Sequence, residues 1–248
     1  MSASRFVTAA LLSVAIAVPA ASQDTAACDC RRRHEHTPGE LELRSSGSLS
    51  FIQSRPTGVF QKNIGFGYGL NGAYLLRLDR AGIVSLRGDA GLLGYGAEHF
   101  YAPLSPTIGG RIQVKVSTTN YLVPLTIGPQ IAWPTGKVRP YVNGGIGAQI
   151  FFTESEVEGT DDQFEFASTT NQSDWTHAWV VGGGVYLPIY QKKTTVAIDL
   201  GAQYFTDGRA QYLRPGSIQD LPNAQIRITP LESSTHMLLV RLGIKVGL

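Results

Sequence analysis

The sequence predicts an all-β protein, an antiparallel up-and-down transmembrane β-barrel of about eight strands. Three observations predict this fold. The chain begins with an export signal, apolar residues alternate with polar or small ones in several later segments, and short connections alternate with long ones.

The first 22 residues have the composition of a secretory signal peptide. Arg5 supplies the positive charge, residues 6–18 are apolar, and residues 19–22 read Pro-Ala-Ala-Ser. The apolar run is too short for a membrane-spanning helix, so we expect cleavage after Ser22 or nearby. Lipidation at Cys28 is disfavoured, because Thr25 stands where an aliphatic residue is usual.

Residues 23–41 are predicted to form a flexible periplasmic segment. Two thiols and two imidazoles lie in it, at Cys28, Cys30, His34 and His36. Such groups can hold zinc, but the spacing of one residue within each pair differs from that of zinc fingers. The run is also short, charged and followed by Thr-Pro-Gly. We therefore expect a linker that touches anionic lipid or cell wall, with no metal and no cofactor.

The remaining residues, 42–248, are predicted to form one barrel domain. The whole chain holds 28 glycines, its charged residues amount to 16%, and its net charge is +2. No apolar run after the signal reaches the roughly 18 residues of a membrane helix, which excludes a helical membrane protein. The small net charge gives no reason to expect a nucleic-acid partner.

Alternation with a period of two residues is clearest at the end of the chain. There the apolar residues Val240, Leu242, Ile244, Val246 and Leu248 alternate with Arg241, Gly243, Lys245 and Gly247. Residues 196–205 and 84–92 repeat the pattern. These runs reach the roughly 9–11 residues that a tilted strand needs to cross a membrane. The last strand is therefore expected to face lipid, to pair with the first strand and to serve as the assembly signal.

Eight strand candidates follow from this pattern and from the turn residues. They are residues 42–53, 65–78, 83–98, 120–134, 140–154, 176–190, 194–207 and 236–248. The connections at 79–82, 135–139 and 191–193 are short, whereas the other four are long and polar. Outer-membrane barrels have tight periplasmic turns and long extracellular loops, so both termini are expected in the periplasm.

Aromatic residues near the strand ends predict two girdles at the membrane surfaces. Trp133, Tyr141 and Tyr190 flank the short turns, and Tyr95, Phe100, Tyr121, Phe152, Trp175, Trp179 and Tyr204 flank the long loops.

Three segments carry a family resemblance: residues 65–70 (Gly-Phe-Gly-Tyr-Gly-Leu), residues 139–147 (Arg-Pro-Tyr-Val-Asn-Gly-Gly-Ile-Gly) and the alternating last strand. With the strand spacing, residues 42–248 resemble the eight-stranded outer-membrane β-barrel families that include OmpX and the OmpA transmembrane domain. The resemblance implies the outer membrane of a Gram-negative-type bacterium, contact with its lipid and lipopolysaccharide, and recognition by the barrel-assembly machinery.

Two departures from that family pattern stand out. Such barrels usually end in an aromatic residue, whereas this chain ends in Leu248. No segment follows the last strand, so the peptidoglycan-binding domain of OmpA is not expected.

The inward face of the predicted barrel carries polar and charged residues: Arg87, Asp89, Asn143, Gln149, Asp199, Gln203, Arg241 and Lys245. An eight-stranded barrel is just wide enough for side chains to fill it. Two interpretations stay open, a paired salt-bridge plug and a narrow polar channel or gate. A soluble lipocalin-like binder would place apolar residues inward, so Arg241 and Lys245 argue against it.

Three histidines near the long loops are the candidates for catalysis. His99 follows Glu98, His177 lies near Ser173 and Asp174, and His236 lies near Ser233 and Ser234. No local motif joins them into a nucleophile and base, so no enzyme is expected. The first functional hypothesis is a structural or surface-interaction barrel whose loop ligand the sequence does not identify. A narrow pore and a lipid-modifying enzyme are the alternatives.

Overall fold

The computed structural model describes residues 45–103, 113–159, 165–214, 216–221 and 225–247. The predicted signal peptide, the segment 23–41 with Cys28, Cys30, His34 and His36, and Leu248 lie outside this described part. Within it, no helix is long and apolar enough to span a membrane.

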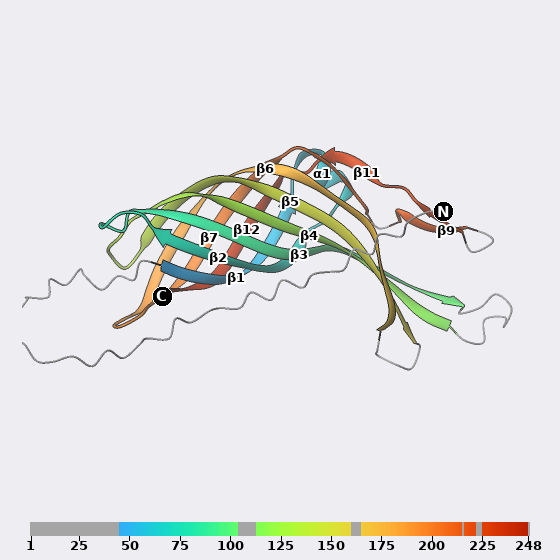
Figure 1. Ribbon diagram of the computed structural model, residues 1–248, viewed down its shortest axis with the longest axis horizontal. Coiled ribbons are helices and arrows are strands. Elements are labelled where there is room, and N and C mark those ends of the chain that lie inside the picture. Colours follow the sequence, from blue (N-terminus) through green and yellow to red (C-terminus); the bar gives the residue numbers. More distant parts are fainter. Residues whose placement is uncertain (1–44, 104–112, 160–164, 215, 222–224, 248) are drawn as a thin grey trace, which may run out of the picture. The chain divides into compact units, whose positions relative to one another are not determined.

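Eight antiparallel strands form a closed barrel, which confirms the predicted fold class (Figure 1). Around the barrel the order is β1, β12, β7, β6, β5, β4, β3, β2. The strands are β1 (Ser45–Pro56), β2 (Gly67–Arg77), β3 (Val84–Pro103), β4 (Gln113–Ala132), β5 (Arg139–Gly159), β6 (Glu165–Gln191), β7 (Thr195–Asp207) and β12 (Met237–Gly247). Each barrel strand therefore pairs with its neighbour in the chain, and the last pairs with the first.

The ladder between β1 and β12 closes the barrel. It runs from the pair Ser46 and Gly247 to the pair Pro56 and Met237. Without it, β1 and β12 would each present a row of unpaired N–H and C=O groups, which cost several kcal/mol apiece in hydrocarbon.

The period-two pattern separates the two faces of the wall. In β12, Val240, Leu242 and Ile244 are 46%, 56% and 53% exposed, whereas Arg241 is 1% exposed. In β7, Leu200 points outward and Asp199 is fully buried. The apolar residues of these strands thus form the outer surface, and the charged ones line the interior.

The strand ends differ from the sequence-based ranges, most of all in β3–β6. These four strands contain 20 to 27 residues each. Residues 168–173, which the sequence analysis leaves in a long polar connection, belong to β6. Their serines and threonines continue the ladder with β5 although they show no apolar alternation. Figure 1 shows β3–β6 continuing beyond the ends of their neighbours.

The two other long connections also fold. The first contains the short helix α1 (Gly58–Asn63), whose one buried residue is Phe60. The last contains β8 (Arg209–Tyr212), β9 (Ile218–Leu221), β10 (Gln225–Ile228) and β11 (Leu231–Ser234), which pair as β8 with β11 and β9 with β10. These connections are therefore not the plain polar loops that the sequence suggested.

The turn between β2 and β3 is held by one carboxylate. The Asp79 oxygens accept hydrogen bonds from the backbone N–H groups of Ile83 and Val84, at 3.1 and 3.0 Å. Desolvation acts to raise the pKa of the Asp79 carboxyl, but these backbone donors hold the pKa below its usual value. Gly82 adopts a φ of 72°, which suits glycine.

The outward position of Ile244 leads to the first prediction. Ile244→Asp should lower the heat-modifiable, folded fraction recovered from membranes, because it places a carboxylate on the apolar face. The cost should lie below the roughly 2–4 kcal/mol of a mid-membrane Arg or Lys. Lys192→Asp, in the exposed turn after β6, is the control and should insert normally. Equal folded fractions for the two variants would show that Ile244 does not face lipid.

Candidate functional site

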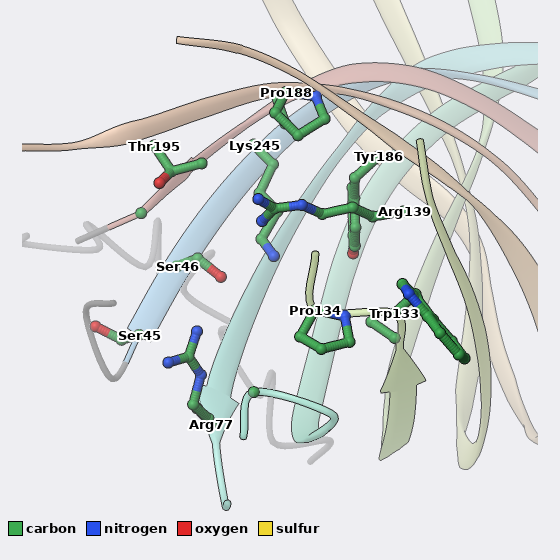
Figure 2. Close-up of a pocket in the computed structure, with 14 residues that line it drawn as sticks. Ser45, Ser46, Arg77, Trp133, Pro134, Arg139, Tyr186, Pro188, Thr195 and Lys245 are labelled. Atoms are coloured by element: carbon green, nitrogen blue, oxygen red, sulfur yellow. The ribbon is translucent and has the colours of Figure 1, made fainter. Parts of the chain in front are cut away.

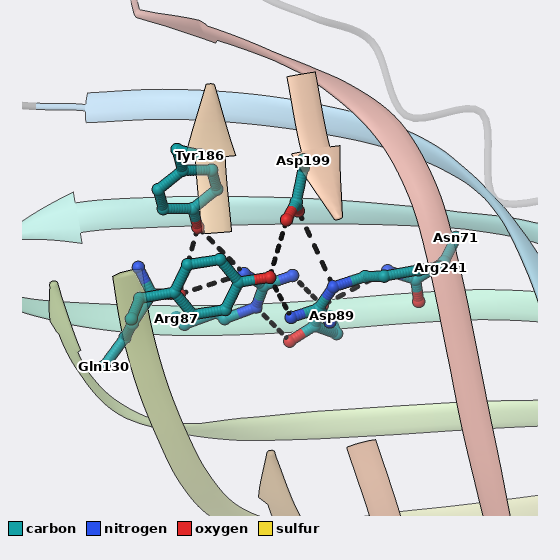
Figure 3. Close-up of polar contacts among 8 residues, drawn as sticks. Asn71, Arg87, Asp89, Gln130, Tyr186, Asp199 and Arg241 are labelled. Carbon is teal, nitrogen blue, oxygen red and sulfur yellow. Dashed lines mark hydrogen bonds and ion pairs between the residues drawn. The ribbon is translucent and has the colours of Figure 1, made fainter. Parts of the chain in front are cut away.

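A polar network occupies the middle of the barrel interior (Figure 3). Arg87 and Asp89 lie two residues apart on the inward face of β3. The Arg87 Nη2 and Nε atoms donate to the two Asp89 oxygens at 2.7 and 2.8 Å. Charge-assisted pairs of this bidentate kind are among the stronger hydrogen bonds in proteins. The pair offsets the cost of burying Arg87, which is 2% exposed.

Tyr141 links a second ion pair across the barrel. Its hydroxyl donates to Asp199 Oδ1 at 2.6 Å and accepts from Arg241 Nη2 at 2.9 Å. Arg241 also lies 3.6 Å from Asp199 and 3.7 Å from Asp89, so the two pairs form one cluster. Gly201 faces this cluster, and a Cβ there would overlap the Tyr141 hydroxyl.

Further members of the network come from residues that the sequence analysis did not select. Gln130 and the Tyr186 hydroxyl each accept from Arg87, at 2.9 and 3.2 Å, and Asn71 donates to Asp89 at 3.2 Å. All three lie on inward positions of strands whose alternation is visible in the sequence, so extending the pattern to β2, β4 and β6 would have found them.

The other predicted interior residues line the barrel outside this network. Asn143, Gln149 and Gln203 are buried, and each has an amide atom without a hydrogen-bond partner among the described residues. Lys245 lies nearer the short turns, with its ammonium 4.2 Å from the centre of the Tyr186 ring. The eight predicted residues thus share the interior, but only Arg87, Asp89, Asp199 and Arg241 form the ionic cluster.

An aromatic plug closes the interior toward the long connections. It consists of Phe60 from α1, Tyr95 from β3, Phe151 from β5 and Tyr212 from β8. The Phe60 ring lies 5.1 Å from Tyr212, 6.1 Å from Phe151 and 6.5 Å from Tyr95. Buried aliphatic residues surround the plug: Ile52, Leu93, Leu122, Met237 and Leu239. Both long connections that fold thus insert side chains into the barrel.

These two layers leave little room along the barrel axis. The hollow beside Arg87 and Asp89 has a volume of ≈ 10 Å³, about the least that one water molecule requires. The filled interior favours the plug interpretation over the channel interpretation.

The predicted girdle residues divide between the two faces. Trp133, Trp175 and Trp179 are 64–65% exposed on the outer surface, and Tyr190 and Tyr204 are exposed as well. Tyr121 and Phe152 stack with ring centres 5.1 Å apart. The Phe100 side chain lies outside what the structure describes.

Tyr141 and Tyr95 correct the girdle prediction, because both lie inside the barrel. Tyr141 alternates with the outward residues Pro140 and Val142, so its own side chain must point inward. Tyr95 lies on the same face of β3 as Arg87, Asp89 and Leu93, so strict alternation also points it inward; the bulge in the ladder with β4 falls between Gly94 and Gly96.

Beyond the closed wall, the ends of β3–β6 form a four-stranded projecting sheet, residues 96–103, 113–120, 153–159 and 165–173. Hydroxyl and amide side chains connect its strands. Thr153 donates to Asn120 at 2.6 Å, and the Ser155 hydroxyl lies 2.7 Å from that of Thr118. Asn171 donates to Ser155 at 2.6 Å, so the connection extends to β6.

Both edges of the projecting sheet lack a partner strand among the described residues. The ladder of β6 with β7 begins at Ala178 and Asp207, and that of β2 with β3 ends at Tyr68 and Gly94. The β6 edge over residues 168–173 reads Ser-Thr-Thr-Asn-Gln-Ser, with neither charge nor proline. Natural edge strands are commonly protected by lysine, proline or bulges. This edge has neither lysine nor proline, but its ladder with β5 is irregular at Asn171, between the pairs Thr153–Gln172 and Glu154–Thr170. The backbone on either side of Asn171 is therefore the part that is open to pairing.

Of the three candidate histidines, His99 has a hydroxyl beside its ring, that of Ser117, which the sequence analysis did not select. His99 Nδ1 lies 3.0 Å from the Ser117 hydroxyl. His236 Nδ1 instead accepts the backbone N–H of Asp207 at 3.0 Å, and the carbonyl of His177 accepts that of Gly208. Each histidine therefore takes part in a local contact at the rim.

The chain is similar to several solved structures. The attachment invasion locus protein Ail of Yersinia pestis, solved with the heparin analogue sucrose octasulfate, is 16% identical, with 83% of this chain and 99% of that chain covered and a TM-score of 0.42. Neisserial surface protein A is 12% identical, with coverage of 82% and 97% and a TM-score of 0.40. A major outer membrane protein of Thermus thermophilus is 13% identical, with coverage of 81% and 98% and a TM-score of 0.35.

These matched proteins are eight-stranded outer-membrane β-barrels or other outer-membrane proteins. No protein-family model matches the sequence, and no curated protein matches it. The architecture rests on the strand pairing of the chain itself, and similarities this distant say nothing about activity.

The ionic cluster leads to the second prediction. Asp199→Ala should lower the free energy of unfolding by about 3–5 kcal/mol, because Arg241 would lose a buried partner. Asp199→Asn keeps an acceptor for the Tyr141 hydroxyl and removes only the charge, so its loss should be smaller. Urea titration of the protein folded in detergent measures both. A midpoint unchanged by Asp199→Ala would show that the cluster does not stabilise the barrel.

Proposed function

We propose that this chain is an integral outer-membrane barrel whose projecting sheet binds a partner polypeptide by strand addition at the open edge of β6. The observation that carries the proposal is the edge at residues 168–173, beyond the closed wall, which has no charge, no proline and no partner strand among the described residues.

The surface of the barrel supports the membrane location. Phe51, Leu70, Ile127, Val142 and Ile146 come from four different strands, and each is 52–61% exposed. A continuous apolar band of this kind is unfavourable in water but suits the lipid-facing side of an outer-membrane barrel. The predicted export signal is consistent with this location.

The two ends of the barrel differ in a way that supports an orientation. At one end, short turns join β2 to β3, β4 to β5, and β6 to β7, while the projecting sheet and the folded connections lie at the other. In outer-membrane barrels the short turns are periplasmic. The proposal therefore directs the projecting sheet outside the cell.

The β6 edge suits an extended peptide for a further reason. Its serines and threonines at 168–170 are exposed, and the hydroxyl and amide bonds between β4, β5 and β6 hold the strand in place before binding. Strand addition obtains its affinity from main-chain hydrogen bonds, so a rigid, uncharged edge accepts a partner without a large ordering cost.

The third prediction tests the orientation. In a chain with Cys28 and Cys30 replaced by serine, Thr169→Cys should react with an impermeant maleimide on intact cells. Lys192→Cys, in a short turn, should react only after the outer membrane is permeabilised. Labelling of Lys192→Cys alone on intact cells would reverse the orientation.

The fourth prediction tests strand addition. Peptides selected from a random 12-residue display library on the folded protein should slow hydrogen exchange at residues 168–173. Neighbouring N–H groups of a strand point to opposite edges, so one of Thr169 and Thr170 directs its N–H to the open edge and the other to β5. Of the variants Thr169→Pro and Thr170→Pro, one therefore removes a donor at the open edge, and the other removes a donor to β5.

The outward-facing proline variant should keep the fold and lose peptide binding by about tenfold or more, since it removes a main-chain hydrogen bond and blocks its neighbours. The other variant should loosen the ladder with β5. Selected peptides that bind both variants as well as the parent would refute the β6 edge as the binding site.

A further inference from the structure

The end of the barrel opposite the projecting sheet contains a hollow lined by basic residues. We call it the basic vestibule and define it by Arg77 from β2, Arg139 from β5 and Lys245 from β12, together with Ser45 and Ser46 from β1. Its volume is ≈ 80 Å³ (Figure 2). None of the described residues that line it is acidic.

Protein contacts hold these cations at the vestibule. The Lys245 ammonium lies 4.2 Å from the Tyr186 ring centre, and the Arg139 guanidinium donates to the Gly136 carbonyl and to Gln191 at 3.4 and 3.5 Å. Arg77 also has interactions of its own. Figure 2 shows the charged ends of Arg139 and Lys245 directed toward the same space. Guanidinium and ammonium groups donate hydrogen bonds to anionic oxygens, so the chemistry of this space suits an anionic group.

A second hollow lies on the outer surface at the same end. This outer groove is lined by Ile83, Ile131, Trp133, Pro140 and Val142, and its volume is ≈ 460 Å³. Its lining is almost entirely apolar, and Trp133 is 65% exposed, as is usual for tryptophan at a membrane surface.

The two hollows meet at one short segment. Ala132, Trp133 and Pro134 line both of them, so a cationic space and an apolar groove lie on either side of the end of β4. A ligand that fits both must carry an anionic group joined to a long apolar chain.

We propose that the basic vestibule and the outer groove together bind one anionic phospholipid of the leaflet that faces the short turns. The headgroup phosphate lies near Arg139 and Lys245, and an acyl chain follows the outer groove past Trp133. This inference rests on the proposed membrane location. It goes beyond that proposal because it assigns a defined lipid site at the end opposite the peptide-binding edge.

The experiment measures retained lipid by native mass spectrometry. The mature protein is folded in a neutral detergent containing equal amounts of dioleoyl phosphatidylglycerol and dioleoyl phosphatidylcholine. The parent protein should retain one phosphatidylglycerol in preference to phosphatidylcholine. Arg139→Gln and Lys245→Gln should each weaken this preference about fivefold, as expected for one cation near an anionic lipid.

Two matched controls separate the site from general charge and general hydrophobicity. Lys192→Gln with Lys193→Gln removes two cations at the same end, outside the vestibule, and should leave the preference unchanged. Trp133→Ala should reduce retention, whereas Trp179→Ala removes an equally exposed tryptophan outside the groove and should not.

The outcomes separate this inference from the proposed function. Equal retention of the two lipids by a protein with heat-modifiable mobility would overturn the lipid site and leave the barrel standing. Displacement of the bound lipid by millimolar inorganic phosphate, with Trp133→Ala behaving as the parent, would assign the vestibule to a free anion instead. A chain that does not fold into detergent would overturn the membrane location and the lipid site together.

Discussion

Closure of the backbone ladder is the constraint on which the rest of this structure depends. A strand in hydrocarbon has no water to satisfy its N–H and C=O groups, so every strand at membrane depth needs two neighbours. The pairing of β1 with β12 supplies the last neighbour. Closure with eight strands also fixes a narrow interior, and the inward half of every strand must fill it. The alternation of apolar and polar residues is therefore a consequence of closure, because each wall residue faces either lipid or the packed interior.

A narrow interior requires that buried charges compensate one another within a few ångströms. Arg87 and Asp89 do so from one strand, whereas Asp199 and Arg241 come from neighbouring strands and need the Tyr141 hydroxyl between them. Gly201 provides the space for that hydroxyl. Toward the long connections, Phe60 and Tyr212 fill the remaining width with aromatic rings from segments outside the wall. The interior thus combines an ionic layer that depends on register with an apolar layer that depends on how the connections fold.

The difference between the ionic layer, which depends on strand register, and the apolar layer, which depends on the folded connections, explains what the sequence could predict. The inward positions of Arg87, Asp199 and Arg241 follow from alternation, which is strong where outward neighbours are aliphatic. The girdle prediction places Tyr141 on the outer surface because Tyr141 lies near a short turn. Its position between the outward residues Pro140 and Val142 instead points it inward. Tyr95 lies an even number of residues from Arg87 on β3, so the same alternation would have placed it inside the barrel. The outer parts of β4–β6 escape detection because serine and threonine in water show no apolar period, and Phe60 lies in a connection where no period exists.

The same constraint decides where this fold can present recognition sites. An unpaired strand edge has a large unfavourable free energy in hydrocarbon, where its N–H and C=O groups find no partner. In water this free energy is small, because solvent satisfies the backbone groups. The open edge of β6 can therefore exist only beyond the apolar band, where β7 no longer accompanies it. At the opposite end β6 also extends past β5, over residues 187–191, but this part is paired with β7 through a tight turn, and Pro188 interrupts its other edge. The recognition proposed at that end therefore uses side chains. Arg77, Arg139 and Lys245 serve this purpose, because three strands bring their long side chains to one opening while the backbone stays paired. The proposed main-chain recognition at one end and the proposed side-chain recognition at the other thus reflect how the strand edges differ between the two ends.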